Sequence, residues 1–233
     1  MARLTALFLA FVLTACVPNF SPSYQRDARI SQMLAPTVRV LSGSSIGSGT
    51  AIIRTQIGTV VVTNNHVVVG TINANARLRV ERYSHGPNGS VQSAGQHEAI
   101  VLKTIPERDL ALILVLGVRD IPLASLSPAD DTALGDEVYT VGAQLGRTPH
   151  ITRGLFSLPS EEINGQRWIL HSSPTLPGNS GGGLYRMRNG RYELIGVPSM
   201  VMILGMSPAA TVALSVPIGD VRAMLTANGY SLI

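Results

Sequence analysis

A serine set between glycines is the feature of this 233-residue sequence that points most directly to chemistry, in the run Pro177–Gly182 (PGNSGG). A serine hydroxyl is a poor nucleophile, so it needs a neighbouring base and hydrogen-bond donors for the oxyanion that its attack creates. Glycines allow the backbone to turn so that N–H groups point inward. The N–H groups of Gly178 and Ser180 are placed to form such an oxyanion hole, although the run alone also fits a tight hairpin.

A histidine that could serve as the base follows a run of β-branched residues in Val61–Val68 (VVTNNHVV). The run predicts a strand, and His66 would lie just beyond its end, where it can face a cleft and act as a general base. The other interpretation of His66 is a surface or core histidine. His85 and His97 lie in polar, loop-like passages that carry no supporting motif, so they are weaker candidates.

An aspartate opens the apolar strand predicted in Arg108–Ile113 (RDLALI). The apolar neighbours of Asp109 partly bury its carboxylate, and a buried carboxylate is costly unless it is hydrogen-bonded. An imidazole N–H would supply that bond, and the carboxylate would hold the ring in one tautomer and stabilise its cation. The other interpretation of Asp109 is an aspartate that caps a turn at the start of a strand.

The elements that must position these residues are mainly strands. From about residue 30, short apolar runs alternate with turn signals about ten residues apart, a pattern typical of β-barrels or sandwiches. A proline-rich passage, Ile121–Pro128, separates two sets of strands, and Asp220–Asn228 is predicted to form a closing helix. The predicted strands are Thr37–Leu41, Gly49–Arg54, Thr59–Thr63, Ala76–Tyr83, Glu98–Thr104, Leu110–Leu116, Glu137–Gly142, His150–Ser157, Gln166–Ser172, Gly183–Arg186, Glu193–Pro198 and Ala210–Val216.

The first residues form a predicted export signal. Arg3 precedes an apolar run, Leu4–Leu13, that is too short to span a membrane as a mature helix and fits a secretory signal. The run leads into Leu-Thr-Ala-Cys, which resembles the lipobox of bacterial lipoproteins and implies that Cys16 carries a lipid and begins the mature chain. An ordinary signal peptide or a short anchor is the alternative. For a lipoprotein, the non-acidic Val17 implies the outer membrane, with the protein facing the periplasm.

The composition favours a folded domain without a nucleic-acid partner. Hydrophobic residues make up 45% of the chain and charged residues 14%, which allows a buried core and argues against disorder. The formal net charge is +4, but the arginines are scattered, which indicates a solvated surface rather than a nucleic-acid site. Cys16 is the one cysteine of the sequence, so no disulfide can form within the chain.

Together the three motifs resemble the trypsin-like superfamily of serine proteases and look most similar to its bacterial HtrA/Deg branch. Their order, His66 then Asp109 then Ser180, is that of this superfamily, and the separations of 43 and 71 residues place the serine in the other half of the chain. The resemblance covers about residues 35–228 and implies an all-β fold of two six-stranded antiparallel β-barrels with a short C-terminal helix. The implied organisation is a lipoprotein signal peptide at 1–15, a tether at 16–30 and a trypsin-like serine protease domain at 31–233, with an N-barrel about 31–122, a C-barrel about 123–218 and a C-terminal helix about 219–228.

The resemblance implies a serine endopeptidase that hydrolyses protein or peptide substrates through an acyl-enzyme, without a metal or organic cofactor. His66, Asp109 and Ser180 would be the catalytic triad, and Gly178 with Ser180 the oxyanion hole. The alternative is a catalytically weak or inactive lipoprotein that keeps the protease fold as a binding module. A structural envelope lipoprotein is a third interpretation, but it would predict helical or low-complexity character that the sequence lacks.

Two features depart from the families that the motifs resemble. Asn179 stands where digestive trypsin-like enzymes carry an aspartate that captures a newly cut N-terminus, so that route of activation is not expected. HtrA proteases usually carry a PDZ domain after the protease domain, and none is expected after Val216.

The resemblance also suggests a substrate pocket whose walls come from the segments around Pro174 and Ser199. Pro174 stands six residues before the serine, where trypsin-type specificity would place an aspartate. Ser199 would offer backbone hydrogen bonds to an extended peptide, and Met200 would add an adaptable apolar surface. We therefore expect cleavage after small or medium apolar residues. The alternative is that His171 reaches the pocket and selects acidic residues.

Overall fold

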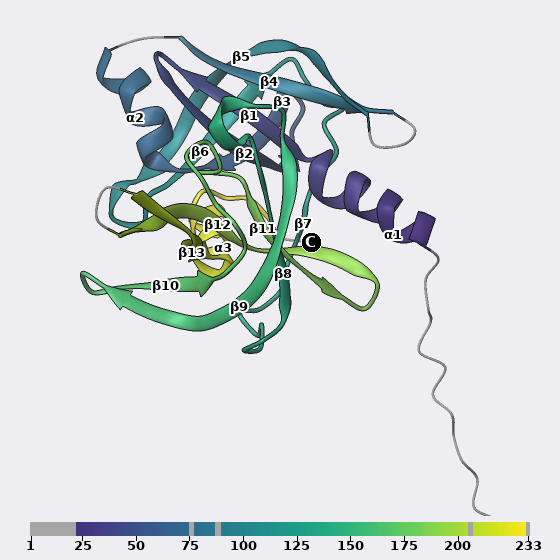
Figure 1. Cartoon of the computed structure of the whole chain (residues 1–233). Coiled ribbons are helices and arrows are strands. Elements are labelled where there is room, and N and C mark those ends of the chain that lie inside the picture. The colour runs from purple at the N-terminus through teal and green to yellow at the C-terminus, as the bar shows by residue number, and fades with distance from the viewer. Residues whose placement is uncertain (1–21, 75–76, 87–89, 205–206, 232–233) are drawn as a thin grey trace, which may run out of the picture.

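The computed structural model describes residues 22–74, 77–86, 90–204 and 207–231. In Figure 1 the strands β1 to β6 form the upper part of the molecule and β8 to β13 the lower part. The elements, in chain order, are α1 (Pro22–Arg29), a π-helical turn (Ile30–Leu34), β1 (Thr37–Ser42), β2 (Ser45–Arg54), β3 (Gly58–Thr63), α2 (Asn65–Ala74), β4 (Leu78–His85), β5 (Val91–Ile105), a 3₁₀ turn (Pro106–Arg108), β6 (Leu110–Leu116), β7 (Ser125–Leu126), β8 (Glu137–Gly142), a 3₁₀ turn (Gln144–Gly146), β9 (His150–Ile163), β10 (Gln166–His171), β11 (Gly183–Arg188), β12 (Arg191–Leu204), β13 (Ser207–Pro217) and α3 (Ile218–Ala227).

The first six strands close into an antiparallel barrel in the order β1-β2-β3-β6-β5-β4. Alternate side chains of a strand face opposite sides of a sheet, and β3 is buried on both sides. Val61 lies in the core of this barrel, whereas Val60 and Val62 belong to a second core shared with the lower sheet. In β6, Ile113 lies in the core of the barrel and Leu112 lies in the shared core. Both strands therefore have continuous apolar runs, Val60–Val62 in β3 and Leu110–Val115 in β6, because they form the wall between the two units.

The second unit is a ring of six antiparallel strands in the order β11-β8-β9-β10-β13-β12, which the pairing of β11 with β12 closes. The short strand β7 pairs with β12 in parallel, with Ser125 opposite Glu193, and extends the ring at one edge. Helix α3 follows β13 and buries Val221 and Leu225 in the shared core. The predicted all-β fold of two six-stranded antiparallel units with a short C-terminal helix is confirmed.

Helix α2 is an element that the sequence pattern does not predict. Its residues include three consecutive valines, Val67 to Val69, and such a β-branched run favours a strand. Val67 and Val68 are nevertheless buried in the core of the first barrel, where α2 contacts β1 and β2. Tertiary packing therefore overrides the local preference of this segment.

Part of the stretch expected to be a tether, 16–30, is helical, because α1 begins at Pro22. Ala28 is buried in the shared core. The Arg29 side chain donates a hydrogen bond from Nε to the Tyr192 hydroxyl at 3.1 Å, and its guanidinium carbon lies 5.4 Å from the centre of the Tyr139 ring. The last turn of α1 is thus part of the folded domain, since it packs on the second unit.

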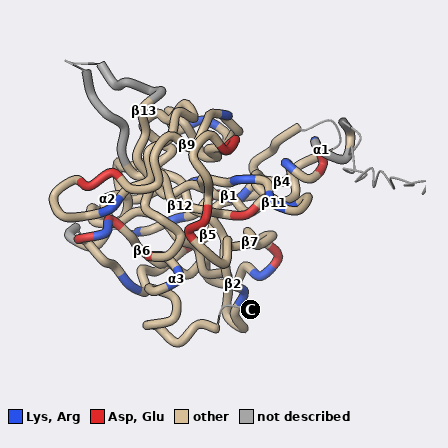
Figure 2. The backbone as a smooth tube through the Cα atoms, turned by 90° about the horizontal axis from the view of Figure 1, so that it is seen from below, with Lys and Arg blue, Asp and Glu red and all other residues tan. Residues whose placement is uncertain are grey.

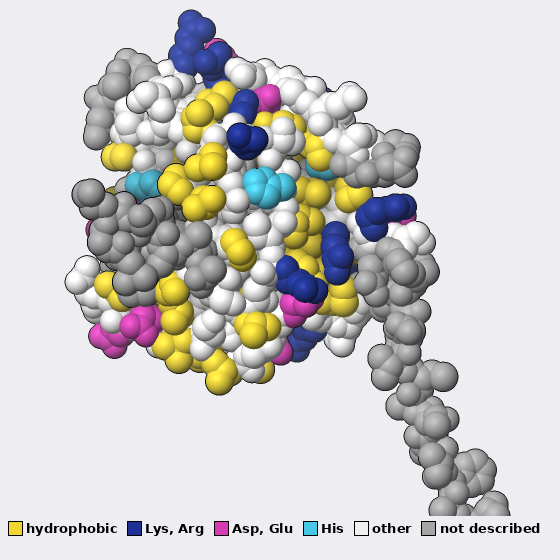
Figure 3. Space-filling view, in the orientation of Figure 1, with side chains coloured by type: hydrophobic (Ala, Val, Ile, Leu, Met, Phe, Trp, Pro, Cys, Tyr) yellow, Lys and Arg dark blue, Asp and Glu magenta, His cyan; other side chains and the backbone are white. Residues whose placement is uncertain are grey.

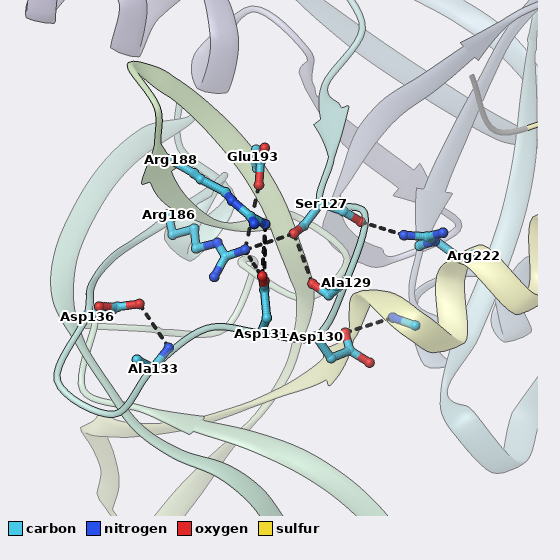
Figure 4. Close-up of polar contacts among 11 residues, drawn as sticks. Ser127, Ala129, Asp130, Asp131, Ala133, Asp136, Arg186, Arg188, Glu193 and Arg222 are labelled. Carbon is cyan, nitrogen blue, oxygen red and sulfur yellow. Dashed lines mark hydrogen bonds and ion pairs between the residues drawn. The ribbon is translucent and has the colours of Figure 1, made fainter.

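An ion network around Arg186 fixes the chain that connects the two units (Figure 4). The Arg186 side chain, only 7% exposed, forms an ion pair with Asp131 and lies 3.7 Å from the Glu193 carboxylate. It also donates a hydrogen bond to Ser127 Oγ at 3.2 Å. The hydrogen bond that Arg186 donates to Asp131 lowers the pKa of the Asp131 carboxyl below its usual value. Arg188 adds a more exposed contact to the same carboxylate at 3.0 Å.

We expect Arg186→Met to lower the free energy of unfolding by about 3 kcal/mol, because it leaves the largely buried Glu193 carboxylate without its cation. Unfolding in urea, followed by circular dichroism, measures this loss. The matched control is Arg188→Met, which removes a partly exposed contact to Asp131 and is expected to cost less than about 1 kcal/mol. Equal losses in the two variants would contradict the structural role of Arg186.

Charged side chains are spread over the molecule rather than gathered in one region. Figure 2 shows Lys and Arg positions interspersed with Asp and Glu positions around the backbone. Figure 3 shows exposed hydrophobic side chains in small groups among polar ones. This distribution agrees with the solvated surface that the scattered arginines predict. Among the described residues, no helix is both long enough and apolar enough to cross a membrane.

Candidate active site

His66, Asp109 and Ser180 come together at the junction of the two units. His66 lies in the first turn of α2, directly after β3. Asp109 precedes β6, the neighbour of β3 in the barrel, and the pairing of Thr63 with Ala111 aligns the ends of these two strands. This alignment brings the residues that follow β3 beside the residue that precedes β6. Ser180 lies in the loop between β10 and β11 of the second unit.

Asp109 fixes His66 through both oxygens of its carboxylate. Oδ2 lies 2.7 Å from His66 Nδ1, and Oδ1 accepts a hydrogen bond from the His66 backbone N–H at 2.9 Å. Asp109 has a left-handed backbone with φ 50°, which Asp and Asn tolerate better than most residues. Its carbonyl accepts a hydrogen bond from Asn64 Nδ2 at 2.8 Å. Because a carboxylate only accepts hydrogen bonds, Nδ1 of the neutral ring carries the proton and Nε2 is an acceptor.

Ser199, on β12, connects this carboxylate with Ser180. Its hydroxyl donates a hydrogen bond to Asp109 Oδ2, and its backbone carbonyl accepts one from Ser180 Oγ at 3.3 Å. Sequence reasoning assigns Ser199 a main-chain role towards a peptide and misses its side-chain contact with Asp109. No local pattern could reveal that contact, because it depends on where β12 passes the start of β6.

The Ser180 hydroxyl points to Ser199 rather than to His66. Among the described residues, no hydrogen bond joins His66 Nε2 to Ser180 Oγ. A serine hydroxyl changes direction by rotation about a single bond between staggered positions. The His66 side chain is 49% exposed, so its ring is open to solvent and to an approaching group. A direct hydrogen bond from Ser180 Oγ to His66 Nε2 would therefore require the Ser180 hydroxyl to leave the Ser199 carbonyl, and hydrogen bonds of this kind commonly tighten only in a substrate complex.

In the segment Gly178–Gly182, two N–H groups have no acceptor among the described residues, those of Gly178 and Ser180. The other three N–H groups of this segment donate to backbone carbonyls; they belong to Asn179, Gly181 and Gly182. Gly178 has φ 98°, and a Cβ added there would lie 2.3 Å from the carbonyl oxygen of Ala143. Only glycine fits this backbone without displacing its neighbour. Two free N–H groups beside a serine are suited to stabilise an oxyanion.

Ser48, fully buried on β2, supports the loop from the first unit. Its hydroxyl donates a hydrogen bond to the Gly178 carbonyl at 2.6 Å and accepts one from the Ala143 N–H at 2.8 Å. The Ser48 N–H donates to the Ser180 carbonyl at 2.8 Å. Sequence analysis does not identify Ser48, because its partner Gly178 lies 130 residues away along the chain. Its contacts fix the backbone on either side of the two free N–H groups.

The expected substrate pocket is described only in part. The Pro174 carbonyl accepts hydrogen bonds from Gln144 Nε2 at 2.9 Å and from Thr152 Oγ1 at 2.7 Å, so this wall is tied to the second unit. Ser199 is 7% exposed. The Met200 side chain, expected to add an apolar surface, lies outside the described residues.

The described part of the chain shows where the alternative pocket residue His171 lies and holds no metal centre. His171, the alternative pocket residue, is fully buried, and its Nε2 lies 2.9 Å from Ser215 Oγ. Burial lowers the pKa of the His171 ring to about 3. The ring is therefore neutral and offers no exposed charge to an acidic substrate. No group of three or more His, Cys, Asp or Glu side chains is placed to hold a metal ion in these described ranges.

Comparison with known proteins finds sequence relatives of this chain. The chain is 24% identical over 211 residues to the "Probable periplasmic serine endoprotease DegP-like" of Pseudomonas putida, a match that covers 87% of this chain and 40% of that protein. It is 31% identical over 124 residues to the "Serine protease PepD" of Mycobacterium tuberculosis, which covers 49% of this chain and 26% of that protein. The chain thus spans less than half the length of these relatives.

Two solved structures share the fold. The "HtrA-type protease AlgW with tripeptide" aligns with a TM-score of 0.66 at 22% identity and covers 90% of this chain and 65% of that one. The serine endoprotease from Yersinia pestis aligns with a TM-score of 0.63 at 20% identity, over 90% of this chain and 67% of that one. A family model of the trypsin-like peptidase domain matches residues 47–197, which is more than half of the chain. The chain therefore belongs to the family of trypsin-like peptidases and has HtrA/DegP-type serine proteases as its relatives.

Proposed function

We propose that this chain is a serine endopeptidase with His66, Asp109 and Ser180 as its catalytic triad. The observation that supports this most is the carboxylate of Asp109, which contacts the His66 ring at 2.7 Å and, through Ser199, adjoins the Ser180 hydroxyl. The N–H groups of Gly178 and of Ser180 itself have no acceptor among the described residues. A base, an orienting carboxylate, a serine and an oxyanion site are the parts that acyl transfer requires.

The proposed mechanism has two half-reactions. Ser180 Oγ attacks the carbonyl carbon of the scissile peptide bond while His66 Nε2 accepts the hydroxyl proton, and the oxyanion is held by the N–H groups of Gly178 and Ser180. The C–N bond then breaks, and the amine leaves with the proton from His66. The acyl group of the substrate stays on Ser180 Oγ as an ester. Water, deprotonated by His66, hydrolyses this acyl-enzyme. Asp109 stays ionised throughout and stabilises the imidazolium.

The proposed substrates are proteins or peptides that present a small or medium apolar residue before the scissile bond. Neither Pro174 nor Ser199 carries a charge, and His171 is buried and neutral, so none of these three residues selects a charged side chain. Binding of an extended peptide along Ser199 would use main-chain hydrogen bonds, as strand addition does elsewhere. The solved relative AlgW is described with a tripeptide, which agrees with a peptide ligand for this fold.

We further propose that the protein is an exported lipoprotein of the bacterial cell envelope. The support is the signal-like sequence at 1–15 followed by Cys16, together with the word periplasmic in the names of several relatives. Cys16 itself lies outside the described residues. The last turn of α1, with Ala28 and Arg29, packs on the folded domain, so a tether between the lipid and the domain would end before Ala28.

A fluorophosphonate probe tests the proposed function directly, because it reacts with a serine only when a base and an oxyanion hole activate that serine. We expect the folded protein to be labelled at Ser180, as located by mass spectrometry of its peptides, and the urea-unfolded protein to remain unlabelled. A library of peptides that varies the residue before the scissile bond should then show a preference for apolar residues. Absence of labelling in the folded protein would favour the inactive binding module, and a preference for arginine would contradict the pocket.

A further inference from the structure

A cavity of about 480 Å³ lies between the end of β2, the chain that links the two units and the C-terminal helix. Cavities of this size hold small organic ligands in other proteins. The cavity shares no residue with the candidate active site. Its lining residues are Ile52, Ile53, Arg54, Leu123, Ala124, Ser125, Leu126, Ser127, Pro128, Arg222 and Ser231.

Most of the lining is apolar and aliphatic. Ile52 and Ile53 come from β2, and Leu123 and Leu126 come from the linking segment that includes β7. Leu123 is 37% exposed, which makes it one of the larger apolar side chains left open to solvent. An aliphatic group seated between β2 and the linking segment would cover this surface, and burial of apolar area favours binding.

The charge of the lining has one sign. Arg54 and Arg222 are its charged residues, and no carboxylate of the described residues lines the cavity. Arg54 Nη2 donates to the Ile121 carbonyl at 3.3 Å, and Arg222 Nη1 donates to the Ser127 carbonyl at 3.1 Å (Figure 4). A guanidinium has five N–H donors, so each arginine keeps donors for a ligand after it has bonded to the backbone.

Three arginines elsewhere in the protein, each buried or half-buried, are neutralised by carboxylates. Arg39, Arg108 and Arg186 each form an ion pair with a carboxylate. Among the ion pairs of the residues that the structure describes, none includes Arg54 or Arg222. A guanidinium binds a carboxylate strongly through charge-assisted hydrogen bonds. Within the part of the chain that the structure describes, the cavity therefore combines aliphatic walls with two arginines that no carboxylate neutralises.

We propose that this cavity binds a small aliphatic carboxylate, with its apolar group between β2 and the linking segment and its carboxylate on Arg222 and Arg54. The same chemistry is offered by a free fatty acid and by an aliphatic amino acid with a free carboxylate. Octanoate and N-acetyl-leucine represent these two sources, and titration calorimetry on the full chain shows which of them the cavity accepts.

Saturable binding of either probe is the expected result. Octanamide, which keeps the chain of octanoate and lacks the charge, should bind at least about tenfold more weakly, because a charge-assisted contact is lost. Acetate, which keeps the charge and lacks the chain, should also bind at least about tenfold more weakly, because little apolar surface is buried. Octanamide that binds as tightly as octanoate would overturn the proposal, as would failure of both octanoate and N-acetyl-leucine to bind.

Variants locate the site. Arg222→Gln and Arg54→Gln should each weaken binding of the accepted probe at least about fivefold, because each removes one cation from the cavity. The matched control is Arg79→Gln, which changes the net charge equally at an exposed position on β4 outside the cavity, and should leave affinity unchanged. Arg54 is exposed, so its variant remains informative even if Arg222→Gln fails to fold. Equal affinities in Arg54→Gln and Arg79→Gln would overturn the assignment.

Discussion

Replacement of Ser180 by alanine is expected to lower kcat by at least about 10⁴-fold while the fold stays intact. The substitution removes one oxygen, whose hydrogen bond goes to the Ser199 carbonyl at 3.3 Å. The N–H groups of Gly178 and of residue 180 itself remain, so a bound peptide keeps its oxyanion donors. The residual rate then measures what binding and oxyanion stabilisation achieve without a nucleophile.

Turnover of casein and of a peptide with an apolar residue before the scissile bond measures this change. Ser157→Ala is the matched control, because Ser157 Oγ also donates to a backbone carbonyl at 3.3 Å, that of Leu155 on β9. Its kcat should equal that of the unchanged protein. If Ser180→Ala kept more than about a tenth of the activity, a nucleophile other than Ser180 would be required.

The features that sequence reasoning predicts best are those whose cause is local. β3 and β6 are recognisable because both of their faces are buried, which favours the continuous apolar runs Val60–Val62 and Leu110–Val115. Gly178 is recognisable because its backbone conformation and its contact with Ala143 exclude any side chain. The three motifs and the all-β architecture therefore follow from the sequence alone.

The features that sequence reasoning misses arise from contacts between distant segments. α2 contains a β-branched run that favours a strand, and its helical state depends on burial of Val67 and Val68 against the barrel. Ser199 reaches Asp109 across 90 residues, and Ser48 reaches Gly178 across 130. Serines are common, and no spacing rule separates a serine with such a partner from one on the surface. The orienting residues of the site are for this reason less predictable than its reacting residues.

Asp109→Asn is expected to lower kcat by about 10⁴-fold, close to the effect of losing the nucleophile, because it reverses the tautomer of His66. The His66 backbone N–H needs an acceptor, so the amide oxygen of the new side chain takes the place of Oδ1. The amide nitrogen then takes the place of Oδ2 and faces His66 Nδ1. It donates to Nδ1, which leaves the proton on Nε2, and a protonated Nε2 cannot accept the proton of Ser180.

Asparagine is the informative replacement because Asp109 has a left-handed backbone, φ 50°, which asparagine tolerates and alanine does not. The variant should therefore unfold at the same urea concentration as the unchanged protein while its activity is lost. Ser199→Ala is the matched control, since it removes one hydrogen bond to the same carboxylate oxygen and leaves the tautomer of His66 as it is. Its kcat should fall by less than about tenfold, in line with the loss of one hydrogen bond. Similar losses in both variants would mean that Asp109 acts by packing rather than by holding the proton of His66 on Nδ1.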